Sequence, residues 1–410
     1  EDFSVIVLDE IHERSLNSDL LLGWFKELKT MREDLHILLI SATIDPKRYI
    51  DFFDDLSIYT VEGRTHPVQI HYEEQISSRS FQERLSQTVQ LALKKIEPQS
   101  SILVFLPGRK SIEEAIERNQ FTSHLSLPLY SSLPFKQQML LFNDTPKIIF
   151  STNVAESSIT LPNIGAVIDS GLEKISVDRG GFGQLKTTDI SQESADQRAG
   201  RAGRTQKGYC FRMWRSTARR RKHRQAEIEH SDLSQAFLHI LDWGITIEDF
   251  AWLTPPSSQR KESTLQQLQL LSLIKDGLIT ERGKQIARIP VHPRLGCVLQ
   301  KAHSLGVFHP CAQLATLLLE DKQIAPHNIL EQCNTIRTNN RIYRQLTRHF
   351  TKTTSEWNTV LIQKAWVCGY KDRIAMYLPT EQCYAISGGG RAQSVHVRQQ
   401  RMRGGCSVQN

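Results

Sequence analysis

The sequence has few cysteines and no long apolar run. Its 410 residues include seven cysteines, an odd number, and none of them forms a C-x-x-C pair. This usage favours unpaired thiols in a reducing compartment over a disulfide framework or a zinc site, and predicts a cytoplasmic protein. No apolar stretch approaches the roughly 18 residues that a membrane-spanning helix needs, and no signal peptide stands at the front. We therefore expect no membrane partner.

A phosphate-binding loop is also missing from the sequence. No segment fits G-x-x-x-x-G-K-[ST], the pattern whose backbone amides and lysine hold nucleotide phosphates. The string RGKQ at 282–285 lacks both the spacing and the Ser or Thr. Because the first residue is Glu rather than Met, we expect the sequence to be a piece of a longer protein.

Basic residues outnumber acidic ones. The chain carries 51 Lys and Arg against 44 Asp and Glu, a formal net charge of +7. A basic balance favours anionic partners, of which nucleic acid is the commonest. The composition is otherwise that of a globular protein long enough for roughly two to four domains.

The first half of the chain alternates between apolar runs and helical patterns. Two runs, SVIVLD and HILLISAT, flank the helically spaced SDLLLGWFKELKTM, which predicts a parallel β-α-β unit. After breakers at Gly63 and Pro67, the pattern restarts with SILVFLPG, the helical RKSIEEAIERN, KIIFST and IGAVIDSG. The predicted fold class is therefore α/β, with two parallel-sheet domains of which the first is truncated.

Strand signals fade after about residue 225. TLQQLQLLSLIKDGLIT predicts a helix, an Asp-Gly turn and a short strand, and residues 292–378 are expected to be mostly helical without β-rich runs. The last twenty residues carry four arginines and no acid, and we expect a loose tail or a cut domain there.

Asp9 and Glu10 end the first apolar run, and His12 follows them. Ligands of open α/β folds bind at the carboxyl ends of parallel strands. Two carboxylates there can hold hydrated Mg²⁺ and orient a water toward a nucleotide phosphate. An Asp-Glu pair by itself is more typical of a helix N-terminus, so the functional interpretation depends on the motifs downstream.

Two short polar motifs follow later strands. Ser41 and Thr43 close the second apolar run, where they can touch a phosphate shell or form an ordinary turn. Thr152 and Asn153 follow KIIF, where they can donate to a nucleic-acid backbone or cap a helix. Neither motif decides between these interpretations alone.

The most specific motif is QRAGRAGR at 197–204. Gln197, Arg201 and Arg204 are spaced by four and three residues, so a helix would place them on a similar face, unobstructed by the small residues between them. Arginine suits the stabilisation of a phosphoryl group in transfer, and glycines are costly in a helix that only faces water. Residues 197–224 hold eleven Lys or Arg and no acid. The later cluster, RSTARRRKHR, is as compatible with phosphate tracking as with a solvated surface.

The motifs DEIH, SAT, STNVAESSIT and QRAGRAGR stand in an order that resembles the DEAH/RHA group of superfamily 2 helicases, from residue 1 to about 390. Farther on, LDWGITIEDFAWLTPPSSQ, ARIPVHPRLGCVL and GYKDRIA with YAISGGGRA resemble the bacterial HrpB type. The resemblance implies an RNA helicase that uses ATP and Mg²⁺ and binds RNA, with DNA also open. It also implies five parts: the end of a first RecA-like domain at 1–61, a second RecA-like domain at 62–225, a winged helix at 226–290, a helical bundle at 291–380 and the start of a C-terminal region at 381–410.

The resemblance assigns catalytic roles by position. Asp9 and Glu10 match the Walker B pair, which binds Mg²⁺ through water and activates the attacking water. His12 would face Gln197 across the cleft between the two sheet domains. Together with Gln197, two arginines match the γ-phosphate and arginine-finger motif: Arg201 and Arg204.

Binding roles follow in the same way. Ser41 and Thr43 match the motif that links the RecA-like domains to nucleic-acid binding, and Thr152 and Asn153 match contacts with the RNA backbone. Phe142 matches an aromatic residue that stacks on adenine in some relatives. The segment 171–191 falls where the group has a strand-separating β-hairpin, and the glycines at 180, 181 and 183 suit its turns.

Functions of different classes stay open on the sequence alone. One is an ATP-dependent RNA helicase of HrpB type, present as a fragment. Another is a non-catalytic nucleic-acid-binding remnant, which the missing phosphate loop favours, and a third is a decayed gene product. Glu10 and the two arginines have no evident structural need, which favours the helicase. A phosphate loop encoded upstream of Glu1 would decide for it.

Overall fold

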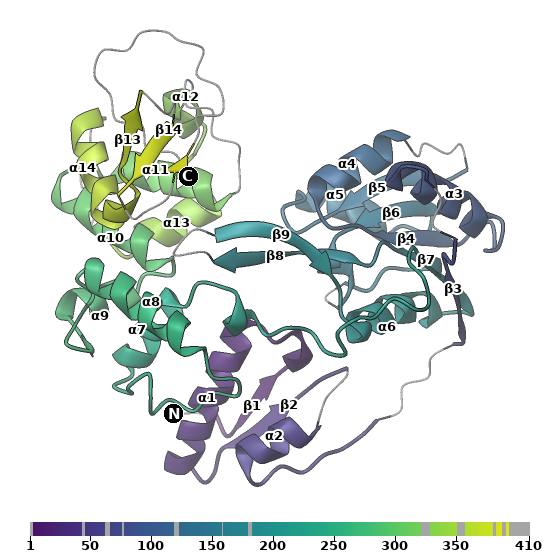
Figure 1. Cartoon of the computed structure of the whole chain (residues 1–410), viewed down its shortest axis with the longest axis horizontal. Helices are drawn as coiled ribbons and strands as arrows, with labels where there is room; N and C mark the ends of the chain where they lie inside the picture. The colour runs from purple at the N-terminus through teal and green to yellow at the C-terminus, as the bar shows by residue number, and fades with distance from the viewer. Residues whose placement is uncertain are drawn as a thin grey trace. The chain divides into compact units, whose positions relative to one another are not determined.

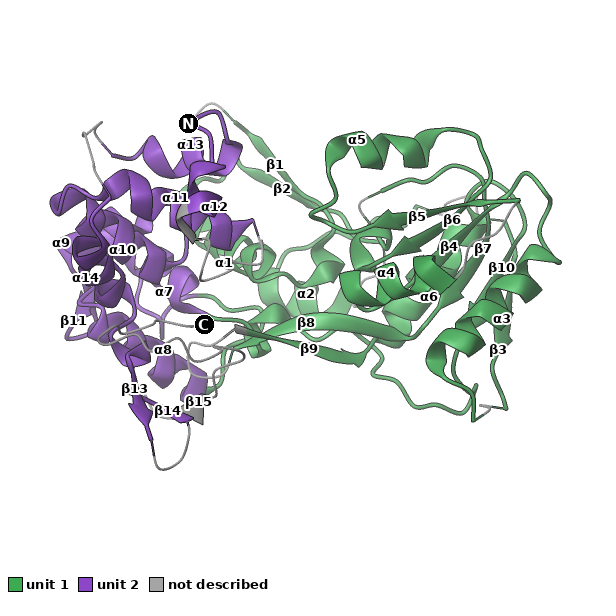
Figure 2. Cartoon of the chain, turned by 90° about the horizontal axis from the view of Figure 1, so that it is seen from above, with its two compact units in different colours: residues 1–232, 251–257 green, residues 233–250, 258–410 purple. Residues whose placement is uncertain are grey.

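The structure is a computed structural model in which two compact units are distinguished (Figures 1 and 2). The first comprises residues 1–232 and 251–257, and the second comprises residues 233–250 and 258–410. The residues that the structure describes are 3–42, 46–61, 66–75, 78–118, 123–157, 159–178, 183–320, 329–350, 357–379, 383–387 and 391–392.

A two-stranded parallel sheet opens the first unit. β1 (Val5–Leu8) pairs with β2 (His36–Leu39), and α1 (Leu16–Met31) lies between them in the sequence. Ser15 begins α1 by accepting a hydrogen bond from the backbone N–H of Ser18. These elements confirm the predicted β-α-β unit, and α2 (Pro46–Phe53) follows it.

The two faces of this small sheet differ. One face packs on a cluster that includes Ile11, Leu22 and Tyr49. On the other face Val7 and Leu38 are about half exposed, at 52% and 50%. Parallel sheets usually have both faces covered, so only one face of this sheet contributes to the core of the unit.

Six parallel strands form the main sheet of the first unit, in the order β3-β10-β7-β4-β6-β5. The three strands β4, β6 and β7 are buried at every position, as expected of apolar strands covered on both faces. This sheet confirms the second predicted α/β domain. Its strands are β3 (Val68–Tyr72), β4 (Ser101–Phe105), β5 (Leu125–Leu129), β6 (Lys147–Ser151), β7 (Ile164–Asp169) and β10 (Gly208–Arg212).

Helices cover both faces of the six-stranded sheet. On one face α3 (Phe81–Leu93) and α4 (Arg109–Arg118) bury apolar side chains in a shared cluster. On the other face the cluster takes in Ala199 from α6 (Gln192–Gly200) and Leu141 from the 3-10 turn Met139–Phe142, which follows α5 (Phe135–Gln138). The arginine motif thus packs directly on the sheet.

An antiparallel hairpin extends from the main sheet domain (Figure 1). β8 (Leu172–Asp178) pairs with β9 (Gly183–Asp189) over seven residue pairs. The hairpin predicted at 171–191 is therefore confirmed. Gly183 begins β9, whereas Gly180 and Gly181 lie outside the described residues.

The second unit begins with two helices, a small hairpin and a third helix. The turn between β11 and β12 contains Asp276 at φ 51° and Gly277 at φ 79°, the left-handed conformations that an Asp-Gly hairpin turn requires. The predicted turn is confirmed. The elements are α7 (Ser234–Asp242), α8 (Ser258–Leu270), β11 (Ile274–Lys275), β12 (Leu278–Ile279) and α9 (Glu281–Ala287).

Helices continue to residue 369, and a buried arginine connects two of them. Arg294 donates to both carboxylate oxygens of Asp372, at 2.6 and 2.7 Å, and to the carbonyl of Gly369 at 3.0 Å. A Cβ on Gly369 would lie 2.3 Å from the carbonyl oxygen of Arg294, so the close approach requires glycine. The helices are α10 (Pro293–Ser304), α11 (Phe308–Leu319), α12 (Ile329–Asn334), α13 (Arg341–Thr347) and α14 (Thr359–Gly369).

The expectation that residues 292–378 hold no strand is wrong at their end. β13 (Ala375–Leu378) pairs with β14 (Cys383–Ile386), which pairs with β15 (Arg391–Ala392), all antiparallel. Tyr377 stands opposite Tyr384, with ring centroids 5.1 Å apart. Four residues are too few to show a clear alternating pattern in the sequence. Formation of this strand depends on its cross-strand partners, which a local pattern does not reveal.

Among the described residues, no helix combines the length and the apolar character that crossing a bilayer demands.

Phe150 tests the core of the main sheet. It lies in β6 and is 0% exposed, so we expect Phe150→Ala to lower the free energy of unfolding by about 3–5 kcal/mol. Phe135, which is 74% exposed, provides the matched control, and Phe135→Ala should change that free energy by no more than about 0.5 kcal/mol. Urea denaturation followed by circular dichroism measures both. Equal shifts for the two variants would contradict this assignment of the core.

Candidate functional site

The two carboxylates predicted to bind magnesium follow β1 directly. The backbone N–H of Glu10 donates to Oδ1 of Asp9 at 2.7 Å. Glu10 itself has φ 56° and ψ 34°, a left-handed conformation that costs a residue other than glycine about 1–3 kcal/mol and is concentrated at functional sites. The chain therefore turns sharply at the strand end, where ligands of α/β sheets bind.

His12 connects this turn with the SAT motif. Its side chain is buried, and Nε2 lies 3.4 Å from Oε2 of Glu10. Its Nδ1 accepts a hydrogen bond from the backbone N–H of Ala42 at 3.4 Å. Ser41 is half-buried beside Ala42, whereas Thr43 lies outside the described residues. The structure thus brings the DEIH and SAT motifs together, and the contact between His12 and Gln197 stays a prediction.

Arg14 is a buried residue that the sequence did not single out. Its guanidinium donates to both carboxylate oxygens of Asp19, at 3.0 and 2.8 Å, and to Oγ1 of Thr254 at 2.7 Å. Burial by itself would lower the pKa of Arg14. The hydrogen bonds and negative charge of Asp19 have the larger effect, so the pKa of Arg14 is raised. These contacts fix the turn after DEIH onto α1, and they could be found only from the tertiary structure.

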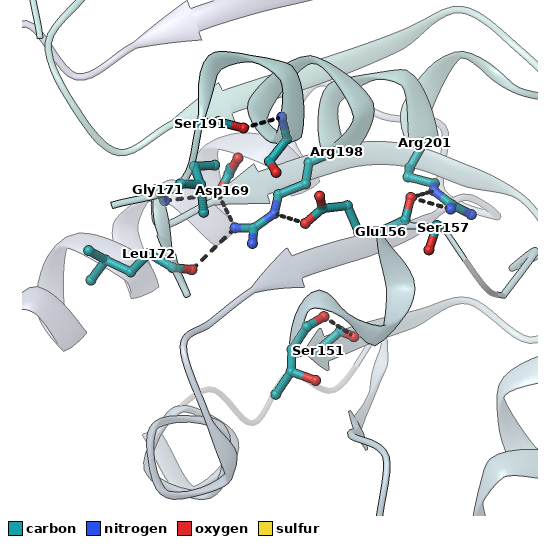
Figure 3. A network of polar contacts seen from close by, with 12 residues as sticks. Ser151, Glu156, Ser157, Asp169, Gly171, Leu172, Ser191, Arg198 and Arg201 are labelled. Atoms are coloured by element: carbon teal, nitrogen blue, oxygen red, sulfur yellow. Dashed lines mark hydrogen bonds and ion pairs between the residues drawn. The ribbon is translucent and has the colours of Figure 1, made fainter. Parts of the chain in front are cut away.

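Arg198, the first arginine of QRAGRAGR, is the centre of a buried ion network (Figure 3). Its side chain is 1% exposed. Nε donates to Glu156 at 3.0 Å, and Nη1 donates to Asp169 at 2.9 Å and to the Leu172 carbonyl at 3.3 Å. Glu156 also accepts a hydrogen bond from Arg224. The motif is thereby connected to β7, to the segment after β6 and to the basic segment that ends at residue 224.

The charges in this network stabilise one another. Burial disfavours both ionised forms, but the carboxylates of Asp169 and Glu156 raise the pKa of Arg198 above its ordinary value. Burial by itself would raise the pKa of Glu156, but the positive charges of Arg198 and Arg224 have the larger effect and lower it. Neither Arg198 nor Glu156 can be singled out from the sequence, because residue spacing does not distinguish a buried charged side chain from an exposed one.

Arg201 and Arg204 have different surroundings. α6 ends at Gly200 and a 3-10 turn continues the motif. Arg201 is 5% exposed, and its guanidinium donates to the carbonyl of Glu156 (Figure 3). It also donates to the carbonyl of Ile159. Arg204 is exposed and donates to Oγ1 of Thr160 at 2.9 Å. Gln197 is half-buried on α6.

The pKa of Arg201 is shifted by burial and by the charged groups near it. Burial, followed by repulsion from Arg204, lowers this pKa to about 10, whereas Glu156 and Glu10 act in the opposite direction. Glu10 and Arg201 therefore lie within electrostatic range, although 190 residues separate them in the sequence. Because burial leaves this cation with less compensation than it needs, an anion near it would be stabilising.

Only one glycine of the motif is required by close packing. A Cβ on Gly203 would lie 2.5 Å from the carbonyl oxygen of His66, and the Gly203 carbonyl accepts the His66 backbone N–H at 2.8 Å. A Cβ on Gly200 would meet nothing within 4 Å. Close backbone approach is thus confirmed at Gly203 and is not needed at Gly200.

The residues predicted to contact RNA stand at the end of β6. The backbone N–H of Thr152 donates to the carbonyl of Leu129 at 3.1 Å. The side chain of Asn153 is exposed in the 3-10 turn Asn153–Ala155. Four residues later, Ser157 donates to Glu13 of the DEIHER segment. The same short loop therefore presents Asn153 and touches the segment that carries Glu10.

Phe142 lies in a turn that a buried lysine stabilises. The ring is 46% exposed at the end of the turn Met139–Phe142. Lys147, which is 1% exposed, donates from Nζ to the Leu141 carbonyl at 3.2 Å and to Oδ1 of Asn143 at 2.6 Å. Lys147 thus fixes both neighbours of Phe142, and stacking on adenine stays a prediction.

Comparisons with known proteins agree with this architecture. Residues 83–206 match the family described as helicase conserved C-terminal domain. The chain is 34% identical over 336 residues to the pre-mRNA-splicing factor ATP-dependent RNA helicase prp22 of Schizosaccharomyces pombe, over 77% of this chain and 29% of that protein. It is also 34% identical over 365 residues to the probable ATP-dependent RNA helicase DHR2 of Saccharomyces cerevisiae, over 81% of this chain and 49% of that protein.

Two crystal structures of Escherichia coli HrpB resemble the chain. One is described as a DExH-box NTPase, with a TM-score of 0.81, and the other as a DEAH/RHA helicase, with a TM-score of 0.83. Each is 27% identical, over 95% of this chain and about half of HrpB, 50% and 51%. These matches support the assignment of the chain to the DEAH/RHA group of superfamily 2 helicases, which its motifs resemble. Within that group it resembles the HrpB type, and it spans 29% and 49% of the lengths of the two curated relatives.

A pair of substitutions separates the structural from the exposed arginine of the motif. Arg198→Met leaves the buried carboxylates of Asp169 and Glu156 without their partner, so we expect a loss of about 3–5 kcal/mol in the free energy of unfolding. Arg204→Met, at an exposed position, should change that free energy by about 0.5 kcal/mol or less. Urea denaturation of both variants measures the difference. Equal stability would show that Arg198 does not maintain the fold.

Proposed function

We propose that this chain acts in an ATP-dependent RNA helicase of HrpB type. The observation that supports this most directly is the hydrogen bond from Ser157 to Glu13, because it joins the segment that carries the carboxylates after β1 to the loop that binds Arg201. An ATPase site shared between two sheets needs a carboxylate on one side and arginines on the other. The relatives named as ATP-dependent RNA helicases support the same conclusion.

The carboxylates suit a magnesium–ATP complex. Asp9 is exposed and the Glu10 side chain is 39% exposed at the strand end. Among the described residues, no group of three or more His, Cys, Asp or Glu could hold a metal alone. This fits Mg²⁺, which is usually bound by one or two carboxylates together with water and substrate phosphates. When bound, the ion would neutralise phosphate charge, while Glu10 orients and deprotonates the attacking water.

The arginines would act on the phosphate that is transferred. Arg204 is exposed, and Arg201 is a buried cation whose partners are carbonyls. Either guanidinium can stabilise the charge that develops on the γ-phosphate. Arg201 is hydrogen-bonded to the same loop that presents Asn153. A change at the nucleotide would therefore be coupled to the RNA contact through this one loop.

The five-part division is proposed with the same boundaries. The order α7, α8, hairpin and α9 supports a winged helix at 226–290, and helices α10 to α14 support a bundle at 291–380. The two parallel sheets support RecA-like parts at 1–61 and 62–225. β13 and β14 pair across the proposed boundary at residue 380. RNA is the proposed partner, with DNA also open, and the cytoplasmic location stays a prediction.

A non-catalytic nucleic-acid-binding role is the competing function. It is favoured by the missing G-x-x-x-x-G-K-[ST] loop in these 410 residues. This role predicts RNA binding that ATP does not change and no hydrolysis in the protein expressed from its complete reading frame. ATP turnover that RNA stimulates would exclude it.

Glu10→Gln tests the catalytic assignment in that protein. Loss of the carboxylate that activates water should reduce RNA-stimulated ATP hydrolysis by about 10²-fold or more, while RNA affinity is retained. Glu33→Gln, at an exposed position between α1 and β2, removes the same charge and should leave turnover unchanged. Normal turnover in the Glu10 variant would refute the assigned role.

The salt dependence of RNA binding by the 410-residue chain tests whether its contacts are with backbone phosphates. Contacts of Lys and Arg with phosphates should make the logarithm of affinity fall by about 0.7 per contact for each unit of log salt concentration. Asn153→Ala removes an uncharged contact and should weaken binding at every salt concentration without changing this slope. Fluorescence anisotropy with a labelled single-stranded RNA measures both quantities. A flat salt response would argue against backbone recognition.

A further inference from the structure

A cavity outside the proposed ATPase site lies beside the β8–β9 hairpin. Its volume is about 410 Å³. Residues of both hairpin strands form one wall, and the segment 219–230 forms the other. Its charged lining consists of four cations and one carboxylate: Lys186, Arg219, Arg220, Arg221 and Asp189. The cavity therefore has a strong excess of positive charge.

Arg220 is a buried cation that is only partly compensated: its guanidinium lies over the Trp214 ring, 4.0 Å from the centroid. Its side chain is 6% exposed, and Nη1 donates to the carbonyls of Gly171 at 3.0 Å and Ile190 at 3.3 Å. The nearest carboxylate oxygen, on Asp189, is 3.7 Å away on a side chain that is 75% exposed. Nε of Arg220 is buried and has no hydrogen-bond partner within the described residues. Burial lowers the pKa of Arg220, as expected for a cation short of negative charge.

The other two arginines are exposed on a fixed backbone. The carbonyl of Arg221 accepts the backbone N–H of Gln192 at 2.7 Å, which attaches the segment to α6. The guanidinium of Arg221 donates to Oε1 of Gln225 at 2.6 Å. His230 fixes the far end, because its carbonyl accepts the N–H of Asp178 at 2.7 Å. The arginines thus border a preformed cavity.

The chemistry of this lining favours a phosphate group. Guanidinium groups are the preferred partners of phosphate oxygens, which accept several charge-assisted hydrogen bonds at once. None of the lining residues, all of them described, is Phe, Tyr or Trp. A platform for stacking a base is therefore lacking, and the backbone of a nucleic acid fits better than a free nucleotide.

A neighbouring hollow connects the cavity to the proposed RNA contacts. This second hollow has a volume of about 120 Å³, and its lining includes Asn153. Three carboxylates and three cations also line it: Glu13, Glu173, Glu227, Lys174, Arg221 and Arg224. The two hollows share four lining residues: Ile175, Arg221, Gln225 and His230. Asn153 and the arginines therefore border adjoining hollows on the same side of the hairpin.

We infer that the arginine cavity at Arg219, Arg220 and Arg221 binds a backbone phosphate of the RNA strand that Asn153 contacts. The inference rests on the RNA binding in the proposed function and adds a second, separate contact to it. The contact is to phosphate alone, so it carries no sequence preference.

The double variant Arg219→Gln/Arg221→Gln tests this site in the 410-residue chain while leaving buried Arg220 in place. We expect affinity for a labelled single-stranded RNA to fall about tenfold, and the salt slope to fall by roughly 0.7 for each contact removed. Lys94→Gln/Arg118→Gln removes the same charge at exposed ends of α3 and α4 and serves as the control, with affinity close to that of the unmodified chain.

Three outcomes overturn the inference. Equal weakening in both double variants would mean that only net charge matters. No weakening in the arginine variant, while Asn153→Ala still weakens binding, would refute the cavity and leave the proposed RNA binding intact. No RNA binding by the unmodified chain would refute both.

Hydrogen exchange distinguishes a nucleic-acid phosphate from a free anion. Protection of β8 and β9 amides by RNA, and not by inorganic pyrophosphate at the same phosphate concentration, supports the inference. Stronger protection by pyrophosphate than by RNA would overturn it in favour of a small-anion site. The same experiment on the RNA-free double variant is the folding control. If its hairpin amides are protected as in the unmodified chain, the variant is folded and its loss of affinity is not due to unfolding.

Discussion

The buried ion network around Arg198 is the constraint on which the first unit depends. One guanidinium joins Asp169 at the end of β7 to Glu156 in the loop after β6, and Glu156 accepts from Arg224 as well. Buried charges are tolerated only when each is paired. The strand, the loop, α6 and the basic segment must therefore all be in place together. The loop that presents Asn153 and the turn that carries Arg201 owe their positions to this requirement.

The network also explains why one motif contains three arginines with different roles. Arg198 is turned inward to the carboxylates, Arg201 is bound to carbonyls of the loop, and Arg204 is exposed. Only the first has full compensation of its charge. The two others keep the capacity to interact with an anion, and the structural arginine fixes the backbone from which they project.

The carboxylate side of the site depends on a different kind of constraint. Glu10 is placed by a left-handed turn rather than by a salt bridge in the core. His12 and Arg14 stabilise that turn through Ala42 and Asp19. Backbone strain is thus compensated by contacts on both sides, which is how strained residues persist at functional sites.

Much of the architecture could be predicted from the sequence. The apolar runs of β1, β4 and β7 and the Asp-Gly turn at 276–277 correspond to patterns of a few neighbouring residues, whereas the hairpin at 172–189 was expected from the family resemblance. The strand at 375–378 was missed because its stability comes from partners later in the chain. The family resemblance came from motifs whose order is visible without any coordinates.

The sequence by itself determined which elements form and which motifs follow them, because hydrophobic periodicity and turn chemistry are local. Tertiary structure alone decided that two of three evenly spaced arginines, Arg198 and Arg201, are buried, and that Glu10 lies within electrostatic range of Arg201. It also decided that Arg220 is buried beside the hairpin, with an Nε that finds no hydrogen-bond partner among the described residues. The physical reason is that burial and charge pairing depend on residues distant in the sequence, and spacing does not contain that information.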